Sequence, residues 1–199
     1  PVNRRQRQMC IRDSNKGAFR VFGHCRPAAY AGGDWWGHYQ TPSGYSYILV
    51  GSVTGRGAEV ALPSALVLGA LDSIRQRSLQ NEPDLDPVDV LELLNSVLWA
   101  RYKGKVTMST AVCRIDHRSG DMEYANAAHP HPILIDAQSE ARTLEVLKGE
   151  GKLLGLGAEC EVALQDKRLF PGDKVVIHTN GIVEATNPDG RAWGGAILK

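Results

Sequence analysis

The sequence has little that would point to a metal–thiolate site, a nucleic acid or a membrane. Its 199 residues contain only four cysteines, Cys10, Cys25, Cys113 and Cys160, and no two of them form a CxxC pair. This spacing argues against a zinc site and a dense disulfide framework, and it predicts reduced thiols in a cytoplasmic protein. Lys and Arg number 23 against 22 Asp and Glu, so the formal net charge is +1. That balance gives no electrostatic basis for binding nucleic acid or an anionic membrane.

Long apolar runs and a targeting segment are also missing. No run approaches the ~20 apolar residues that a membrane helix requires, and the first residues, PVNRRQRQ, do not form a signal peptide. The chain does not begin with Met, which predicts a piece of a longer protein. Residues 9–14, MCIRDS, are the string that one reading frame of a common sequencing adapter would encode. We therefore place no functional weight on residues 1–14, and we treat residues 1–18 as a lead-in and residues 19–199 as the domain, which we expect to be incomplete at the C-terminus.

The composition is that of one soluble globular domain. Hydrophobic residues make up 43% and charged residues 23%, both ordinary values. A chain of this length buries roughly 70% of its unfolded surface, so it needs no metal or disulfide merely to fold. Glycine is enriched, with 21 residues. Glycine is required where the backbone turns tightly or approaches a ligand, so the positions of these residues matter more than their number.

A strand, a glycine-rich turn and a helix follow one another in the first half. Residues 45–50 alternate and then become apolar, which predicts a strand. Residues 51–57, GSVTGRG, predict a turn, and residues 58–76 predict a helix with Pro63 in its first turn. The expected buried face of this helix consists of Ala61, Ala65, Leu68 and Leu71.

A second helix is predicted from Asp86 to about Trp99. Asp86 suits the N-cap, and Pro87 suits the first helical position, where its missing N–H does no harm. The apolar stripe of this helix consists of Val88, Leu91, Leu94 and Leu98.

The remainder is rich in predicted strands. Residues 110–115 and 122–126 flank a hairpin turn at residues 117–120, and residues 174–178 form a strongly apolar strand. Weaker strand signals occur at residues 133–135, 143–147 and 161–169. Strands gathered around two adjacent helices predict an α+β fold in which two sheets pack face to face with helices outside.

Three loops carry the residues suited to chemistry. They are AGGDWW at residues 31–36, GSVTGRG at 51–57 and TNGIVEA at 179–185. Further blocks follow the same order as a known family: LLNSVL at 93–98, YANAAHPHP at 124–132, PGD at 171–173 and HTNGIVEATN at 178–187. Over roughly residues 20–194 the sequence resembles the bacterial PP2C-type (PPM) serine phosphatases of the SpoIIE/RsbU class. The resemblance implies the PPM sandwich of two antiparallel sheets flanked by helices, with the C-terminal strand truncated.

The resemblance also implies a centre of two Mn²⁺ or Mg²⁺ ions. The family positions for the metal ligands are Asp34, Ser52, Asn180 and, through its backbone carbonyl, Val53, while Arg56 is a weaker candidate for contacting the substrate phosphate. The family carries aspartates where this sequence has Ser52 and Asn180. Because ligand charge sets the affinity of hard divalent cations, the loss of two carboxylates predicts weak or absent metal binding.

Two functions therefore remain open. The first is a metal-dependent protein serine/threonine phosphatase domain, weakened or inactive in this sequence, that acts on a phosphorylated regulator of the anti-anti-sigma (STAS-fold) type. The alternative is a pseudophosphatase that binds such a partner without turning it over. The resemblance also allows a dimer. A third function, on a small phosphorylated molecule, has no residue that supports it.

Two other features have structural interpretations. His129, directly before Pro130 in AAHPHP, is expected to shape a turn rather than to act in catalysis. At least one of Trp35 and Trp36 is expected to be buried.

Overall fold

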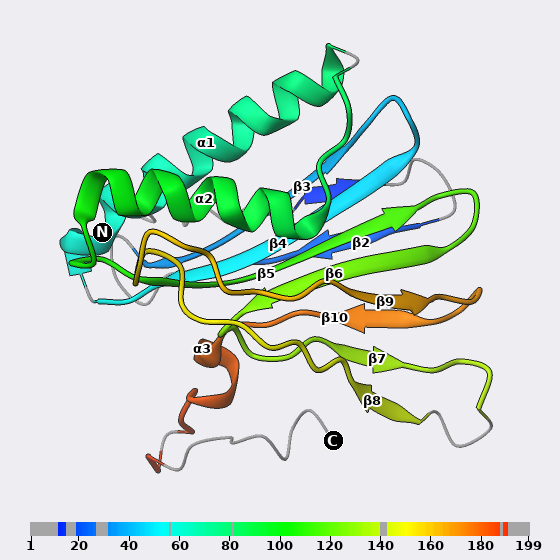
Figure 1. Ribbon diagram of the computed structural model, residues 1–199. Coiled ribbons are helices and arrows are strands. Elements are labelled where there is room, and N and C mark those ends of the chain that lie inside the picture. The colour runs from blue at the N-terminus through cyan, green and yellow to red at the C-terminus, as the bar shows by residue number, and fades with distance from the viewer. Residues whose placement is uncertain are drawn as a thin grey trace, which may run out of the picture.

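The computed structural model describes residues 12–14, 19–26, 32–55, 57–80, 82–139, 143–187 and 189–190 (Figure 1). In chain order its elements are β1 (Arg12–Ser14), β2 (Val21–Gly23), β3 (Asp34–Gln40), β4 (Tyr45–Val53), the 3₁₀ helix η1 (Gly57–Val60), α1 (Ala61–Leu79), α2 (Pro87–Tyr102), β5 (Met108–Asp116), β6 (Asp121–Ala127), β7 (Ile133–Ile135), β8 (Leu144–Val146), β9 (Gln165–Arg168), β10 (Lys174–Val176) and α3 (Asn180–Val183).

The fold is layered, as the sequence predicted. Helices α1 and α2 cover one face of a five-stranded sheet with the order β3-β4-β5-β6-β9, and a three-stranded sheet, β10-β7-β8, lies on the other side (Figure 1). Neighbouring strands in both sheets are antiparallel. The predicted α+β sandwich of two antiparallel sheets is thus confirmed, with both long helices on the same side. Strand β1, within the lead-in, pairs with β2.

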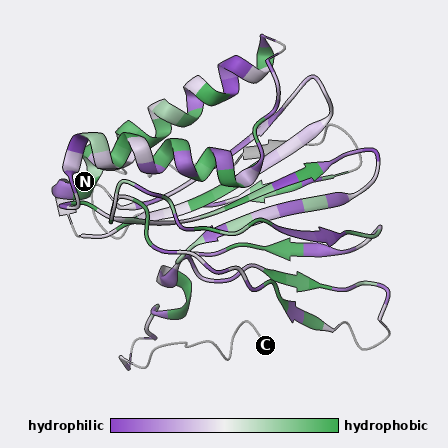
Figure 2. Ribbon diagram, in the orientation of Figure 1, coloured by the Kyte–Doolittle hydropathy of each residue, from purple (hydrophilic) through white to green (hydrophobic). Residues whose placement is uncertain are grey.

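Strand β5 separates two hydrophobic cores. Successive side chains of a strand point to opposite faces. Val112 accordingly packs with the residues of α1 and α2, whereas Cys113 packs with Leu134 of β7 and with other residues of the smaller sheet's side. Figure 2 shows the corresponding mixture of hydrophobic and hydrophilic residues along the helices and strands. The larger sheet is therefore buried on both faces around β5.

Helix α1 buries a different face from the expected one. The prediction of Ala65 and Leu68 as core residues is wrong, because both are exposed. Pro63 does lie in the first turn. The buried positions are Pro63, Ser64, Val67, Leu71, Ile74 and Ser78. Val67 and Ile74 are larger than alanine and bury more apolar area, so they decide the orientation of the helix.

Helix α2 begins as predicted. The Asp86 carboxylate accepts hydrogen bonds from the backbone N–H groups of Val88 and Asp89, at 2.8 and 2.9 Å. Asp89 completes a capping box by accepting from the Asp86 backbone N–H. Leu91, Leu94 and Leu98 are fully buried, whereas Val88 is only half-buried and Val90 takes the adjoining core position.

The sequence predicts a loop at residues 31–36, but this is wrong from Asp34 onward, where strand β3 begins. Asp34 to Gln40 form the edge strand of the larger sheet and pair with β4 from Asp34↔Ser52 to Gln40↔Ser46. Trp35 and Tyr39 are buried on the helix side. Trp35 donates its indole N–H to the Met108 sulfur at 3.3 Å. The expected burial of at least one tryptophan is confirmed.

The remaining expectations differ mainly in length. The turn at residues 117–120 joins β5 to β6 as predicted. The predicted helix at 58–76 begins instead with η1, and strands β9 and β10 are shorter than the predicted ones. The expected truncation of the C-terminal strand concerns residues 191–199, which lie outside the described residues. In the part of the chain that the structure describes, none of the helices combines the length and apolar character needed to cross a membrane.

The capping box generates the first prediction. Asp86→Ala removes the acceptor for two helix N–H groups, so we expect the free energy of unfolding to fall by about 1 kcal/mol. The measurement is urea denaturation followed by circular dichroism. The control is Asp72→Ala, because Asp72 lies on the exposed side of α1. Equal stability losses in the two variants would contradict the role of the cap.

Candidate active site

Polar side chains form a row across one end of the larger sheet. Asp34 of β3 pairs with Ser52 of β4, and Ser52 pairs with Ser109 of β5. Their neighbours Trp35, Val53 and Met108 are buried on the helix side. Because side chains alternate along a strand, the polar row lies on the opposite face of the sheet, toward the smaller one.

The Asp34 carboxylate is the centre of this row. Ser52 donates its hydroxyl to Asp34 Oδ1 at 2.6 Å, and Thr179 donates its hydroxyl to Asp34 Oδ2 at 2.6 Å. Thr179 lies between β10 and α3, 145 residues away in the sequence. We call Asp34, Ser52 and Thr179 the Asp34 cluster. It joins the edge of the larger sheet to the segment that leaves the smaller one.

The candidate metal ligands differ in their contacts and in their exposure. Asp34 and Ser52 are in direct contact. Asn180 follows Thr179, begins α3 and is exposed. The structure therefore brings the three segments together, while the assignment of these residues as metal ligands stays a prediction. Arg56, the candidate for contacting phosphate, lies outside the described residues.

Val53, the candidate carbonyl ligand, is held against Gly33. The Val53 backbone N–H donates to the Gly33 carbonyl at 3.0 Å. A Cβ at Gly33 would lie 2.6 Å from the Val53 carbonyl oxygen, which is closer than real contacts allow. Gly33, the second glycine of the GGD motif, is thus required because two backbone segments approach each other closely here.

His129 lies beside the polar row, although the sequence suggested only a turn. Its Nδ1 is 3.0 Å from the Ser109 hydroxyl, and its ring is buried. Burial lowers the pKa of His129 to about 4, with the neighbouring Asp34 charge acting in the opposite direction. His129 is therefore neutral at pH 7. Its Nε2 is buried without a hydrogen-bond partner among the described residues.

The turn that positions His129 is built by Asn126. The Asn126 amide oxygen accepts from the His129 backbone N–H at 2.7 Å, and its amide nitrogen donates to the His129 carbonyl at 3.0 Å. Asn126 is fully buried, and Ala128 in the turn has a left-handed φ of 53°. The prediction that His129 belongs to a turn is consistent with this geometry. The turn also places the imidazole ring of His129 beside Ser109 of the polar row.

Three participants were missed by the sequence analysis: Thr179, Ser109 and the site contact of His129. Ser109 could have been found by continuing the β4–β5 register from Ser52. Thr179 and His129 come from segments whose approach depends on how the two sheets pack, and no local signal reports that.

The donors described here differ from those that a pair of divalent ions prefers. Hard cations favour several carboxylate oxygens, but the Asp34 cluster offers one carboxylate, and both of its oxygens accept hydroxyl protons. Within the described ranges, no group of three or more His, Cys, Asp or Glu side chains is arranged to hold a metal ion. The residues present do not fit a two-ion centre.

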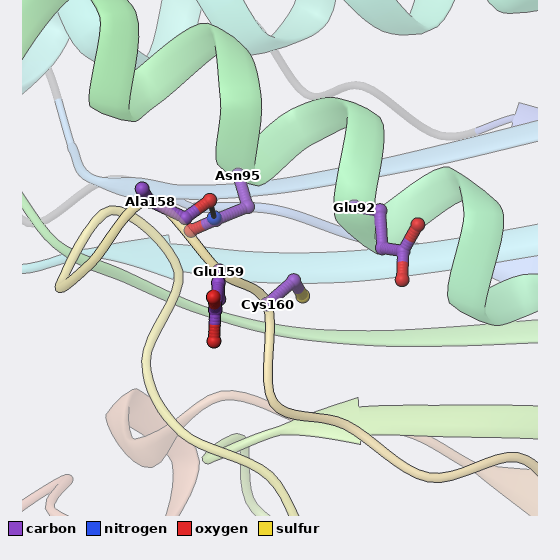
Figure 3. A pocket seen from close by; sticks show the side chains of 5 residues that line it. All are labelled: Glu92, Asn95, Ala158, Glu159 and Cys160. Atoms are coloured by element: carbon purple, nitrogen blue, oxygen red, sulfur yellow. Dashed lines mark hydrogen bonds between the residues drawn. The ribbon is translucent and has the colours of Figure 1, made fainter.

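A cavity away from the Asp34 cluster is lined by a residue with a structural role, Asn95. It has a volume of about 340 Å³ and lies between α2 and the loop at residues 158–160 (Figure 3). Asn95, in its lining, donates to the carbonyls of Gly157 and Ala158 and accepts from the Gly155 N–H at 2.7 Å. The asparagine of the LLNSVL block therefore fastens this loop to the helix.

The buried imidazole generates a prediction of pH dependence. The pKa of His129 falls from 6.5 to about 4 on folding, so the unfolded state binds more protons between these values. Above pH 6.5 this group costs no stability, but as the pH falls toward 4 the free energy of unfolding decreases by up to about 3 kcal/mol. We expect His129→Gln to flatten this part of the pH–stability profile, measured by denaturation. His24→Gln, at an exposed histidine, should keep the slope; a wild-type slope in His129→Gln would refute the assignment.

Comparison with known proteins is consistent with this geometry. The family model described as "Stage II sporulation protein E (SpoIIE)" matches residues 42–198. The phosphoserine phosphatase RsbU of Bacillus subtilis (strain 168) is 24% identical over 164 residues, which is 82% of this chain and 46% of that protein. The chain thus spans less than half the length of this curated relative.

Solved structures share the architecture. The RsbU and RsbW domains of Rv1364c from Mycobacterium tuberculosis match with 25% identity and a TM-score of 0.64, covering 80% of this chain and 42% of that one. The SiaA-PP2C domain of Pseudomonas aeruginosa matches with 21% identity and a TM-score of 0.71, covering 86% and 65%; this second likeness concerns the fold alone. With the family match extending over most of the sequence, the chain belongs to the SpoIIE family and is a PP2C-type serine phosphatase domain of the SpoIIE/RsbU class.

Proposed function

We propose that this domain binds a phosphorylated regulatory protein of the anti-anti-sigma (STAS-fold) type, and that its metal-dependent hydrolysis of phosphoserine is weak or absent. The single observation that carries the proposal is the state of Asp34, whose two carboxylate oxygens both accept hydroxyl hydrogen bonds. The resemblance to the SpoIIE/RsbU class supports this choice of partner.

The charge at the site supports weak metal binding. PP2C-type relatives imply a dependence on divalent metal ions, and two such ions bring a charge of +4. Here Asp34 supplies −1, whereas Ser52 and Asn180 are neutral. Without compensating carboxylates, the two cations would repel each other at the short separation that such centres require. We therefore propose that Mn²⁺ and Mg²⁺ bind weakly, through Asp34, the Val53 carbonyl and the Asn180 amide oxygen.

A binding role is favoured over turnover because the packing of the sheets does not require carboxylates at positions 52 and 180. The residues that build the sheet and hold β3 against β4, such as Trp35 and Tyr39, are buried apolar side chains. Hydrophobic burial of this kind is unaffected by the loss of carboxylates at the rim. The domain can therefore keep a surface that recognises a partner even where hydrolysis has been lost.

Restoring the two carboxylates tests the proposal. We expect the double variant Ser52→Asp/Asn180→Asp to bind Mn²⁺ at least about tenfold more tightly than the wild type, which requires only about 1.4 kcal/mol. We also expect it to gain Mn²⁺-dependent turnover of a phosphoserine peptide. The measurements are isothermal titration with MnCl₂ and release of inorganic phosphate.

The matched control is Ser52→Asn, which adds bulk at the same position without charge and should leave Mn²⁺ affinity near the wild-type value. Wild-type turnover equal to that of the double variant in Mn²⁺ would show that the domain is an active phosphatase and would overturn the proposal.

A further inference from the structure

Two parts of the fold that are distant in sequence meet at one carboxylate. Asp34 opens β3, the edge strand of the larger sheet, while Thr179 leaves β10, the edge strand of the smaller sheet. The Thr179 hydroxyl and Asp34 Oδ2 lie 2.6 Å apart. This side-chain bond therefore spans the two layers at the end of the molecule where α3 lies (Figure 1).

The geometry of both bonds is that of strong hydrogen bonds. Hydroxyl-to-carboxylate bonds of 2.5–2.7 Å are charge-assisted and stronger than bonds between neutral groups. Both bonds to Asp34 measure 2.6 Å, and all three side chains belong to half-buried residues. A partly buried carboxylate requires compensation for its lost hydration. Here two hydroxyl protons supply it.

Within the part of the chain that the structure describes, the other hydrogen bonds of segment 179–184 are local. Asn180, Gly181 and Glu184 are exposed, and Ile182 is 48% exposed. The backbone bonds of α3, from Ile182 N–H to Thr179 and from Glu184 N–H to Asn180, are local to the segment. Local bonds close a turn but do not hold it against a sheet. Among the contacts of the described residues, the bond from Thr179 to Asp34 joins this segment to the larger sheet.

We infer that the Asp34 cluster is a metal-independent fastening, in which the hydroxyls of Ser52 and Thr179 donate to the Asp34 carboxylate in place of water and hold the segment after β10 against the larger sheet. Thr179 is thereby a positioning residue. This role concerns stability and goes beyond the proposed function. It can hold whether or not the domain hydrolyses phosphoserine.

The first test is thermal unfolding in EDTA. We expect Thr179→Val and Ser52→Ala each to lower the unfolding midpoint by about 3–6 °C, as the loss of a hydrogen bond to a charged group predicts for a domain of this size. The matched control is Thr54→Val, which removes the hydroxyl of an exposed residue that accepts a hydrogen bond from the Thr107 hydroxyl at 3.0 Å. It should change the midpoint by less than about 1 °C. A shift in Thr179→Val no larger than in the control would overturn the inference.

A double-mutant comparison isolates the Asp34 contact. In an Asp34→Ala background, Thr179 has lost its acceptor, so Thr179→Val should cause no further fall in the midpoint. An equal fall in both backgrounds would mean that Thr179 acts through other contacts, and this would refute the fastening.

Two further readouts separate the fastening from a metal site. Addition of 1 mM MnCl₂ after EDTA should leave the wild-type midpoint unchanged, because a ligand that bound the native state would raise it. A rise of several degrees would contradict metal independence.

Hydrogen exchange at the Ile182 and Glu184 amides should accelerate at least about tenfold in Thr179→Val, with the amides of the β7–β10 pair unchanged. Unchanged exchange at these two amides would also overturn the inference. Neither readout depends on turnover, so a failure here is distinguishable from a failure of the proposed function.

Discussion

The antiparallel register of β3, β4 and β5 is the constraint on which the site depends. A shift of one residue would turn every side chain of a strand to the other face. Asp34 would then point into the helix-side core, and Trp35 would point away from it. The burial of Trp35, Val53 and Met108 on one face therefore determines that Asp34, Ser52 and Ser109 share the other. The polar row exists because the hydrophobic core fixes the register.

This dependence runs in one direction. The core determines where the polar side chains lie, but the polar side chains contribute little to the core. The chemistry of the row can therefore change while the fold persists. Membership in the SpoIIE family and retention of the sandwich are consequently compatible with the weak metal binding that we propose.

The sequence allowed correct prediction where the signal was local. Asp86 followed by Pro87 identified the start of α2, because an N-cap and its helix are adjacent in the chain. The α1 face was predicted wrongly because alanine suits exposed and buried helix positions alike, so Ala61 and Ala65 carried no directional information. Strand β3 was missed because two glycines precede it and its aromatic residues do not alternate: Trp35 and Trp36 are adjacent, and Tyr39 follows only after Gly37 and His38.

The sequence indicated segments that the structure brings together, but it did not indicate the contacts between them. The motif resemblance identified Asp34, Ser52 and Asn180, and their segments do lie at one end of the sheets. It did not identify Thr179 as the partner of Asp34, because that contact depends on how the smaller sheet packs on the larger. It also did not identify His129 as a neighbour of Ser109, because the Asn126-built turn aims the ring.

The side chain of Asn95 has a mechanical consequence. Its amide uses both ends on the backbone of residues 155–158, so this loop is coupled rigidly to the middle of α2. The same loop touches β5, where the Leu154 and Met108 backbones exchange two hydrogen bonds, one residue from Ser109. A continuous set of hydrogen bonds therefore joins the middle of α2, the loop at residues 155–158 and the strand that carries Ser109, so these three parts of the fold keep a fixed spacing.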